Sequence, residues 1–238
     1  TQAMTRELGV EREPMKTISE ARETLLTSFS DDWGSDIATL KGVPWGKAMM
    51  WVFLLSDTFI FTCFLVGYMS VRMSTVEPWP NPSEVFALHA FGASVPLLLI
   101  AIMTFVLISS SGTMAMAVNM GYQRRKEAAT NLILVTALLG ATFVGMQAFE
   151  WSKLILDEGV RPWTNPFGAP QFGAVFFMVT GFHGLHVSAG VIYLLTIAFR
   201  IRRGKYDESN FEIVEITGLY WHFVDLVWVF IFALFYLW

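Results

Sequence analysis

AVFFMVTGFHGLHVSAGVIYLLTIAF, residues 174–199, is the clearest structural signal in this chain. The stretch is 26 residues long and contains no Asp, Glu, Lys or Arg. A helix rises about 1.5 Å per residue and needs roughly 20 apolar residues to cross a bilayer. We therefore expect a transmembrane helix here, with His183 and His186 near its middle. Ionisable side chains at that depth are costly, so other segments must supply their partners.

On a helical wheel this segment has a polar side and a neighbouring side of small residues. His183 and His186 fall on the polar side, whereas Gly181, Gly184 and Ser188 fall on the other. Small residues let membrane helices approach closely, so we expect this helix to be central. The histidines are compatible with two readings. They are either neutral and hydrogen-bonded to neighbouring helices, or part of a metal site or proton relay.

The composition of the whole chain supports a membrane protein. Apolar residues make up 54% and charged residues only 15%, whereas soluble domains carry about a quarter charged residues. The net charge of −4 is weak and the basic residues cluster, so the global charge says little about partners, and we expect no nucleic acid among them. Cys63 is the one cysteine, so no disulfide can form within the chain.

The apolar runs predict an all-α membrane protein with five transmembrane helices in residues 48–238, preceded by a polar arm over residues 1–47. A loop with Pro78, Pro80 and Pro82 separates the first two spans, because prolines at every second position interrupt helix and strand pairing. The expected spans are 48–70, 95–117, 129–154, 174–199 and 213–238.

The basic residues predict the orientation of these spans. The links after the second and fourth spans are rich in Lys and Arg, and the opposite links are not. By the positive-inside rule the basic links, and with them the arm, are cytoplasmic, and Trp238 lies outside. The basic links hold Arg124, Arg125, Lys126, Arg200, Arg202, Arg203 and Lys205, and the opposite links hold Arg72, Lys153 and Arg161.

A few ionisable residues interrupt the other spans. Asp57 lies near the middle of the first, where a charge costs about 2.5–3.5 kcal/mol, among aromatic residues that favour a dry site. Counting residues from the span ends allows Asp57, His222 and Asp225 to share a layer if their helices touch, with the two central histidines just outside it. Glu150 lies farther away, towards the outer face. His222 and Asp225 are one turn apart and can share a partner.

Several of these motifs, taken together, resemble subunit III of the haem–copper respiratory oxidases. The motifs are LSD at 55–57, QAFE at 147–150, TGFHGLHV at 180–187 and WHFVDLVW at 221–228. Glu215, seven positions ahead of His222, follows the same pattern. The similarity runs from about Trp45 to Trp238 and fits the short, five-helix form of the family. Longer members have seven spans, and here the polar arm replaces the first two.

The resemblance implies a non-catalytic accessory subunit of a terminal oxidase that reduces oxygen to water and pumps protons. It implies no catalytic residue, metal, haem or copper in this chain, because haem and copper belong to the partner subunits. The implied partners are the catalytic subunit I, subunit II and bound phospholipid. The implied location is a bacterial cytoplasmic membrane. Cytochrome c is favoured over quinol as the electron donor.

The resemblance also implies roles for individual residues. Asp57 matches a buried carboxylate, usually Glu in the family, that is linked to proton handling. The other matching positions are interpreted as internal polar packing or as the lining of a lipid site. They are Glu150, His183, His186, Glu215, His222 and Asp225.

Two other functions are compatible with the residues alone. A membrane metalloenzyme would need more nitrogen ligands than four histidines supply, although a site of two His and two carboxylates is conceivable. A transporter or proton channel would use buried carboxylates as relays. However, the sequence contains no inverted repeat and no pair of spans broken midway by Gly or Pro.

Overall fold

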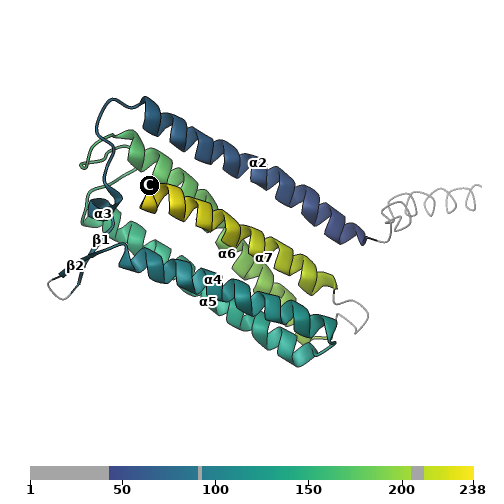
Figure 1. Ribbon diagram of the computed structural model, residues 1–238. Helices are drawn as coiled ribbons and strands as arrows, with labels where there is room; N and C mark the ends of the chain where they lie inside the picture. The colour runs from purple at the N-terminus through teal and green to yellow at the C-terminus, as the bar shows by residue number, and fades with distance from the viewer. Residues whose placement is uncertain (1–42, 91–92, 205–211) are drawn as a thin grey trace, which may run out of the picture. The chain divides into compact units, whose positions relative to one another are not determined.

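A computed structural model describes residues 43–90, 93–204 and 212–238 of the chain. Five helices in these residues are long and apolar enough to cross a membrane, which confirms the predicted all-helical, five-span fold (Figure 1). Most of the predicted arm and Lys205 lie outside the described residues. The long helices are α2 (Trp45–Ser74), α4 (Leu98–Tyr122), α5 (Lys126–Leu156), α6 (Gln171–Arg202) and α7 (Glu212–Phe232), and α7 continues into a π-helix, η1 (Ala233–Leu237).

Most of the helices are longer than their apolar runs. The central helix α6 extends three residues beyond the predicted span at each end, from Gln171 to Arg202 instead of 174–199. Polar and basic residues favour helix as well as apolar ones do, and at the membrane surface their side chains reach water and headgroups. The apolar run therefore marks the part of the helix in hydrocarbon, and not the whole helix.

The segment before α4 differs from its prediction. The second span was expected to begin near Val95. Instead, a short helix α3 (Pro82–Val85) is followed by strand β1 (Ala87–Ala90), and β1 pairs antiparallel with strand β2 (Ala93–Pro96). Pro96 is therefore in extended backbone. Leu97 then adopts a left-handed conformation with φ of 59°, and the helix begins only after this turn.

Helices α4, α5, α6 and α7 form the packed part of the bundle. α4 contacts α5 and α7, and α6 also contacts α5 and α7, so each of the four has two neighbours. α2 runs along the side formed by α6 and α7 (Figure 1). Only 11% of its membrane-crossing window is buried, against 28–44% in the other four helices. α2 is therefore attached through a limited set of side chains.

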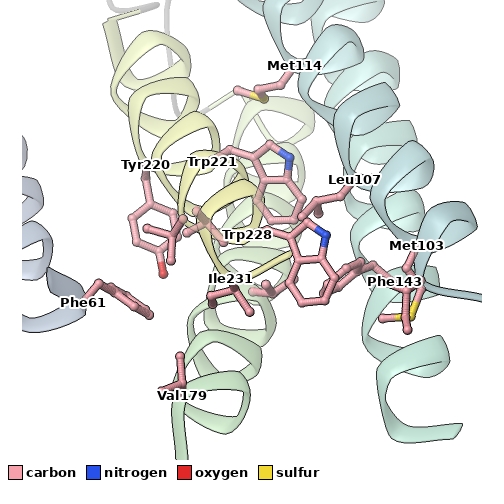
Figure 2. Packing of buried hydrophobic residues seen from close by; sticks show 14 of the residues in the cluster. Phe61, Met103, Leu107, Met114, Phe143, Val179, Tyr220, Trp221, Trp228 and Ile231 are labelled. Atoms are coloured by element: carbon pink, nitrogen blue, oxygen red, sulfur yellow. The ribbon is translucent and has the colours of Figure 1, made fainter. Parts of the chain in front are cut away.

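Two tryptophans of α7 fill the centre of the four-helix unit. Trp221 and Trp228 are at most 1% exposed, and both rings lie between α7 and the pair α4 and α5 (Figure 2). The Trp221 indole N–H donates to Ser110 Oγ at 3.0 Å, and that of Trp228 donates to Thr104 Oγ1 at 3.0 Å. A buried indole needs such an acceptor, so these two bonds set the rotation of α7 against α4.

Glycines allow the close helix contacts, although not mainly at the predicted positions. A Cβ at Gly140 of α5 would lie 2.4 Å from the Trp221 ring, and one at Gly190 of α6 would lie 2.9 Å from it. The predicted stripe contributes less, because Gly181 has a 3.2 Å neighbour and Gly184 has none within 4 Å. The Trp221 ring leaves no room for a Cβ at Gly140 or Gly190, so these positions of α5 and α6 require glycine.

Candidate functional site: polar groups inside the bundle

Contacts at both ends show that α2 and α7 run in the same direction. Arg202 near the end of α6 donates to Asn131 near the start of α5, which places the links after α4 and α6 at one end. At one end Lys47 of α2 forms an ion pair with Glu215 of α7. At the other end the Tyr68 hydroxyl of α2 donates to the carbonyl of Leu234 at 2.9 Å. The links after α4 and α6 therefore lie at the same end of the bundle as the start of α2. The basic residues Arg124, Arg125, Lys126, Arg200, Arg202 and Arg203 share that end.

The most chemically distinctive contact joins Asp57 of α2 to His186 of α6. Asp57 Oδ2 lies 3.1 Å from His186 Nε2, and the two side chains are 7% and 13% exposed. Although the Asp57 side chain is shorter than that of Glu, its carboxylate reaches the imidazole of His186. The sequence predicted that both residues lie inside the bundle, but it did not pair them.

The second ring nitrogen of His186 determines how protons are arranged in this pair. His186 Nδ1 lies 2.9 Å from the backbone carbonyl of Phe182, which can only accept a hydrogen bond. Nδ1 must therefore carry a proton. The contact with Asp57 is then a hydrogen bond in only two states, a protonated Asp57 donating to neutral His186 or an imidazolium donating to the carboxylate. Both states hold one proton in the contact between the two residues.

Aromatic rings surround one side of this pair. Phe61, which is 3% exposed, has its ring centroid 5.4 Å from that of His186, and the Phe182 ring is 4.7 Å from it. The Tyr220 hydroxyl of α7 donates to the His186 carbonyl at 3.0 Å. The predicted apolar surround is thus provided mainly by Phe61, whereas Phe53 is 44% exposed.

His183 lies on a different side of α6 and does not join the pair. Its ring is 1% exposed, stacks on Trp228 at 5.4 Å and meets Phe143 edge-on at 6.0 Å. Neither ring nitrogen has a hydrogen-bond partner among the described residues. The three-residue spacing from His186 turns the two rings towards different helices, so one packs among aromatics while the other meets a carboxylate.

Glu150 belongs to a separate buried cluster near the opposite end from the basic links. Glu150 is 4% exposed, and its Oε2 accepts from Gln147 Nε2 at 2.8 Å and from the Tyr236 hydroxyl at 3.3 Å. Sequence reasoning missed Tyr236, because a Tyr near the end of an apolar run is typical of the membrane interface. Its place in the π-helix η1 turns this ring inward, where it is 1% exposed.

The three remaining polar candidates lie nearer the surface of the bundle than predicted. His222 is exposed, and its Nδ1 lies 2.7 Å from Ser111 Oγ of α4. Asp225 is half-buried and also contacts Ser111, so the two residues share a partner. Glu215 is half-buried in its ion pair with the α2 lysine. His222 points towards α4, so it does not contact Asp57 of α2.

These polar side chains are suited to acid–base chemistry. Within residues 43–90, 93–204 and 212–238, no group of three or more His, Cys, Asp or Glu is placed to hold a metal ion. The described contacts instead form an Asp–His pair between α2 and α6 and a Glu–Gln–Tyr cluster in the packed unit. Such pairs can hold a proton or pass one on.

Fold and site together define a five-helix membrane protein with titratable groups in its interior. A family model described as cytochrome c oxidase subunit III matches residues 30–238. The chain therefore belongs to the subunit III family of the haem–copper oxidases, as the motifs predicted.

Three relatives illustrate the range of the family. Cytochrome c oxidase subunit 3 of Rhipicephalus sanguineus is 33% identical, over 92% of this chain and 77% of that protein. Cytochrome c oxidase subunit 3 of Alkalihalophilus pseudofirmus is 29% identical, over 79% of this chain and 84% of that protein. A probable quinol oxidase subunit 3 of Staphylococcus epidermidis is 30% identical, over 80% of this chain and 88% of that protein. Family membership makes the chain part of an oxidase complex, and the relatives include both donor types.

Proposed function

We propose that this chain is a non-catalytic accessory subunit of a terminal oxidase that reduces oxygen to water and pumps protons. Haem and copper are then held by its partners, the catalytic subunit I and subunit II. Family membership supports this proposal, as does the way the interior polar groups bond to one another. Bacterial relatives favour a bacterial cytoplasmic membrane, with the basic end of the bundle inside.

The observation that carries the functional part of the proposal is the Asp57–His186 contact. Nδ1 of His186 bonds a carbonyl, and Nε2 lies 3.1 Å from Asp57 Oδ2. One proton can therefore be shared between two side chains that can both release it. The pair is at the edge of the packed unit, where α2 meets α6, and both side chains retain slight exposure. We infer that the pair buffers protons for the neighbouring catalytic subunit and supports sustained proton uptake.

A second group of residues supports a role in holding the complex together. His222 is exposed on α7, within a membrane-crossing helix, and is hydrogen-bonded to Ser111 of α4. A polar ring facing hydrocarbon is costly, so we infer that the catalytic subunit covers this face and supplies a polar partner. The lipid-lining role implied for the candidate residues remains part of the same proposal.

Cytochrome c is the electron donor that we propose. The description of the matching family and two relatives name cytochrome c oxidase, although several quinol oxidase relatives have similar identity. Oxygen consumption by the purified complex with reduced cytochrome c, compared with a quinol, tests this choice. Faster turnover with quinol would reverse it.

Co-purification tests the accessory role. With an affinity tag on this chain, we expect haem-bearing partner chains to purify with it in equal amounts. Haem bound to this polypeptide alone, or proton flux by the isolated chain in liposomes, would contradict the proposal and favour an enzyme or a channel.

A matched pair of variants tests the assembly face. His222→Leu removes the exposed ring, and we expect the chain to leave the complex at lower detergent concentration. Ser111→Ala removes the internal partner of the ring but leaves the ring in place, so we expect nearly normal retention. Equal retention of both variants would mean that no partner contacts His222.

A further inference from the structure

A groove between α5 and α6 opens at the basic end of the bundle, away from all the polar groups described above. It consists of two adjoining cavities of about 430 Å³ each, and Arg202 lines both. None of the seven candidate residues from the sequence lines either cavity. The polar cavity is lined by Lys126, Glu127, Thr130, Asn131 and Arg202, and the apolar cavity by Leu134, Leu195, Thr196, Ala198, Phe199 and Arg202.

The polar cavity is suited to an anion. Lys126 and Arg202 contribute two positive charges against one negative charge from Glu127. Arg202 is held in place because its Nη2 donates to Asn131 Oδ1 at 3.3 Å. α5 begins at Lys126 without a side-chain cap, so backbone N–H groups of its first turn also lack side-chain acceptors. Two cations beside a helix start attract phosphate in preference to a neutral ligand.

The apolar cavity continues from the polar one along the two helices. Leu195 and Phe199 of α6 are 47% and 54% exposed, and Leu134 of α5 faces them across the groove. Arg202 lies where the two cavities meet. The groove therefore changes from charged to apolar along its length, as the molecule of a membrane lipid does.

We propose that an anionic phospholipid binds between α5 and α6, with its phosphate between Lys126 and Arg202 and an acyl chain against Leu134 and Leu195. Charge complementarity favours an anionic headgroup over a zwitterionic one, whose positive ammonium group would meet the same two cations. This site is separate from the polar packing positions and from any cleft formed with helices that the longer family members carry. It goes beyond the accessory function and does not depend on proton handling.

Native mass spectrometry of the purified oxidase complex tests this proposal. The complex in detergent is titrated with dioleoylphosphatidylglycerol, dioleoylphosphatidylcholine or glycerol 3-phosphate, and lipid adducts are counted on this subunit after its release. We expect adducts with phosphatidylglycerol only. Phosphatidylcholine adducts as abundant as those of phosphatidylglycerol would overturn the preference for an anionic headgroup. Glycerol 3-phosphate binding as strongly as phosphatidylglycerol would show that the site binds anions in general, and would overturn the assignment to a lipid.

Charge variants locate the site. Each basic residue near an anionic lipid contributes about 1 kcal/mol, so Lys126→Gln and Arg202→Gln should each weaken phosphatidylglycerol binding about fivefold. Arg124→Gln is the matched control, because Arg124 lies in the same basic link but lines neither cavity. An equal loss in the control would mean general attraction to a basic surface and would overturn the site.

A steric variant tests the acyl-chain half without changing charge. Thr196→Trp places a large ring in the apolar cavity and should remove most lipid adducts. Thr142→Trp is the matched control, since both threonines are exposed and both hydroxyls bond the carbonyl four residues earlier. Unchanged lipid binding in Thr196→Trp would show that no acyl chain occupies this groove.

Discussion

Replacing Asp57 with Ala should leave the complex assembled but impair its sustained turnover. The change leaves Nε2 of His186 without its 3.1 Å partner, beside the ring of Phe61. An unpartnered buried polar group costs about 1–3 kcal/mol, and side-chain hydrogen bonds in membranes average about 0.6 kcal/mol. Both figures are below the roughly 5–15 kcal/mol that stabilises a domain. α2 also keeps its contacts at both ends, through Lys47 and Tyr68.

The assay is oxygen consumption by the complex in proteoliposomes, followed over many turnovers together with proton uptake. We expect Asp57→Ala to slow proton uptake or to shorten the period of constant turnover. Asp57→Asn separates proton handling from structure, because its amide can donate to Nε2 of His186 but cannot release a proton to a neighbour. Thr58→Ala is the control, since that hydroxyl bonds only the Leu54 carbonyl of its own helix, at 2.7 Å. Constant turnover in Asp57→Asn, with a loss only in Asp57→Ala, would refute a proton role.

Three further changes test the packing of the helices by thermal unfolding of the complex. Gly140→Ala places a Cβ 2.4 Å from the Trp221 ring and should destabilise by about 1–3 kcal/mol, whereas Gly145→Ala, with nothing within 4 Å, should have little effect. Tyr68→Phe removes a 2.9 Å bond to the backbone of η1 and a 2.9 Å bond from Arg72, and should cost about 1–3 kcal/mol. Lys47→Gln should cost less than about 1 kcal/mol and only at low salt, because both side chains of its ion pair are about a quarter exposed.

The five spans were predictable because each depends on a local property, a long run without charge. The start of α4 was not, because it depends on contacts outside the run. Val95 and Pro96 have apolar side chains that suit a membrane helix, but their backbone pairs with Leu88 and Ala87 in the hairpin. The π-helix at the end of the chain is a similar case. A sequence does not show the extra residue per turn that brings Tyr236 to Glu150.

The polar site was predictable in its residues but not in its pairing. Counting along a helix gives the depth of a side chain, and it placed the central histidines just outside the depth of Asp57 without pairing them. Depth does not give the direction in which a helix faces. His222 faces α4 and Ser111, so it cannot meet Asp57 although their predicted depths match. Residue spacing alone also could not decide whether His183 or His186 faces α2.

The position of the Asp57–His186 pair links the attachment of α2 to any proton role of the subunit. α2 is little buried, so its place against α6 and α7 depends on a few side-chain contacts along its length. Asp57 supplies the contact near the middle, and its hydrogen bond to His186 needs a proton on one of the two facing atoms. While Nδ1 of His186 stays bonded to the Phe182 carbonyl, loss of that proton removes the hydrogen bond and weakens the attachment of α2 at that point, whereas moving the ring proton to Nε2 restores it at the expense of the carbonyl bond. Proton occupancy and the packing of α2 are therefore coupled through a single 3.1 Å contact.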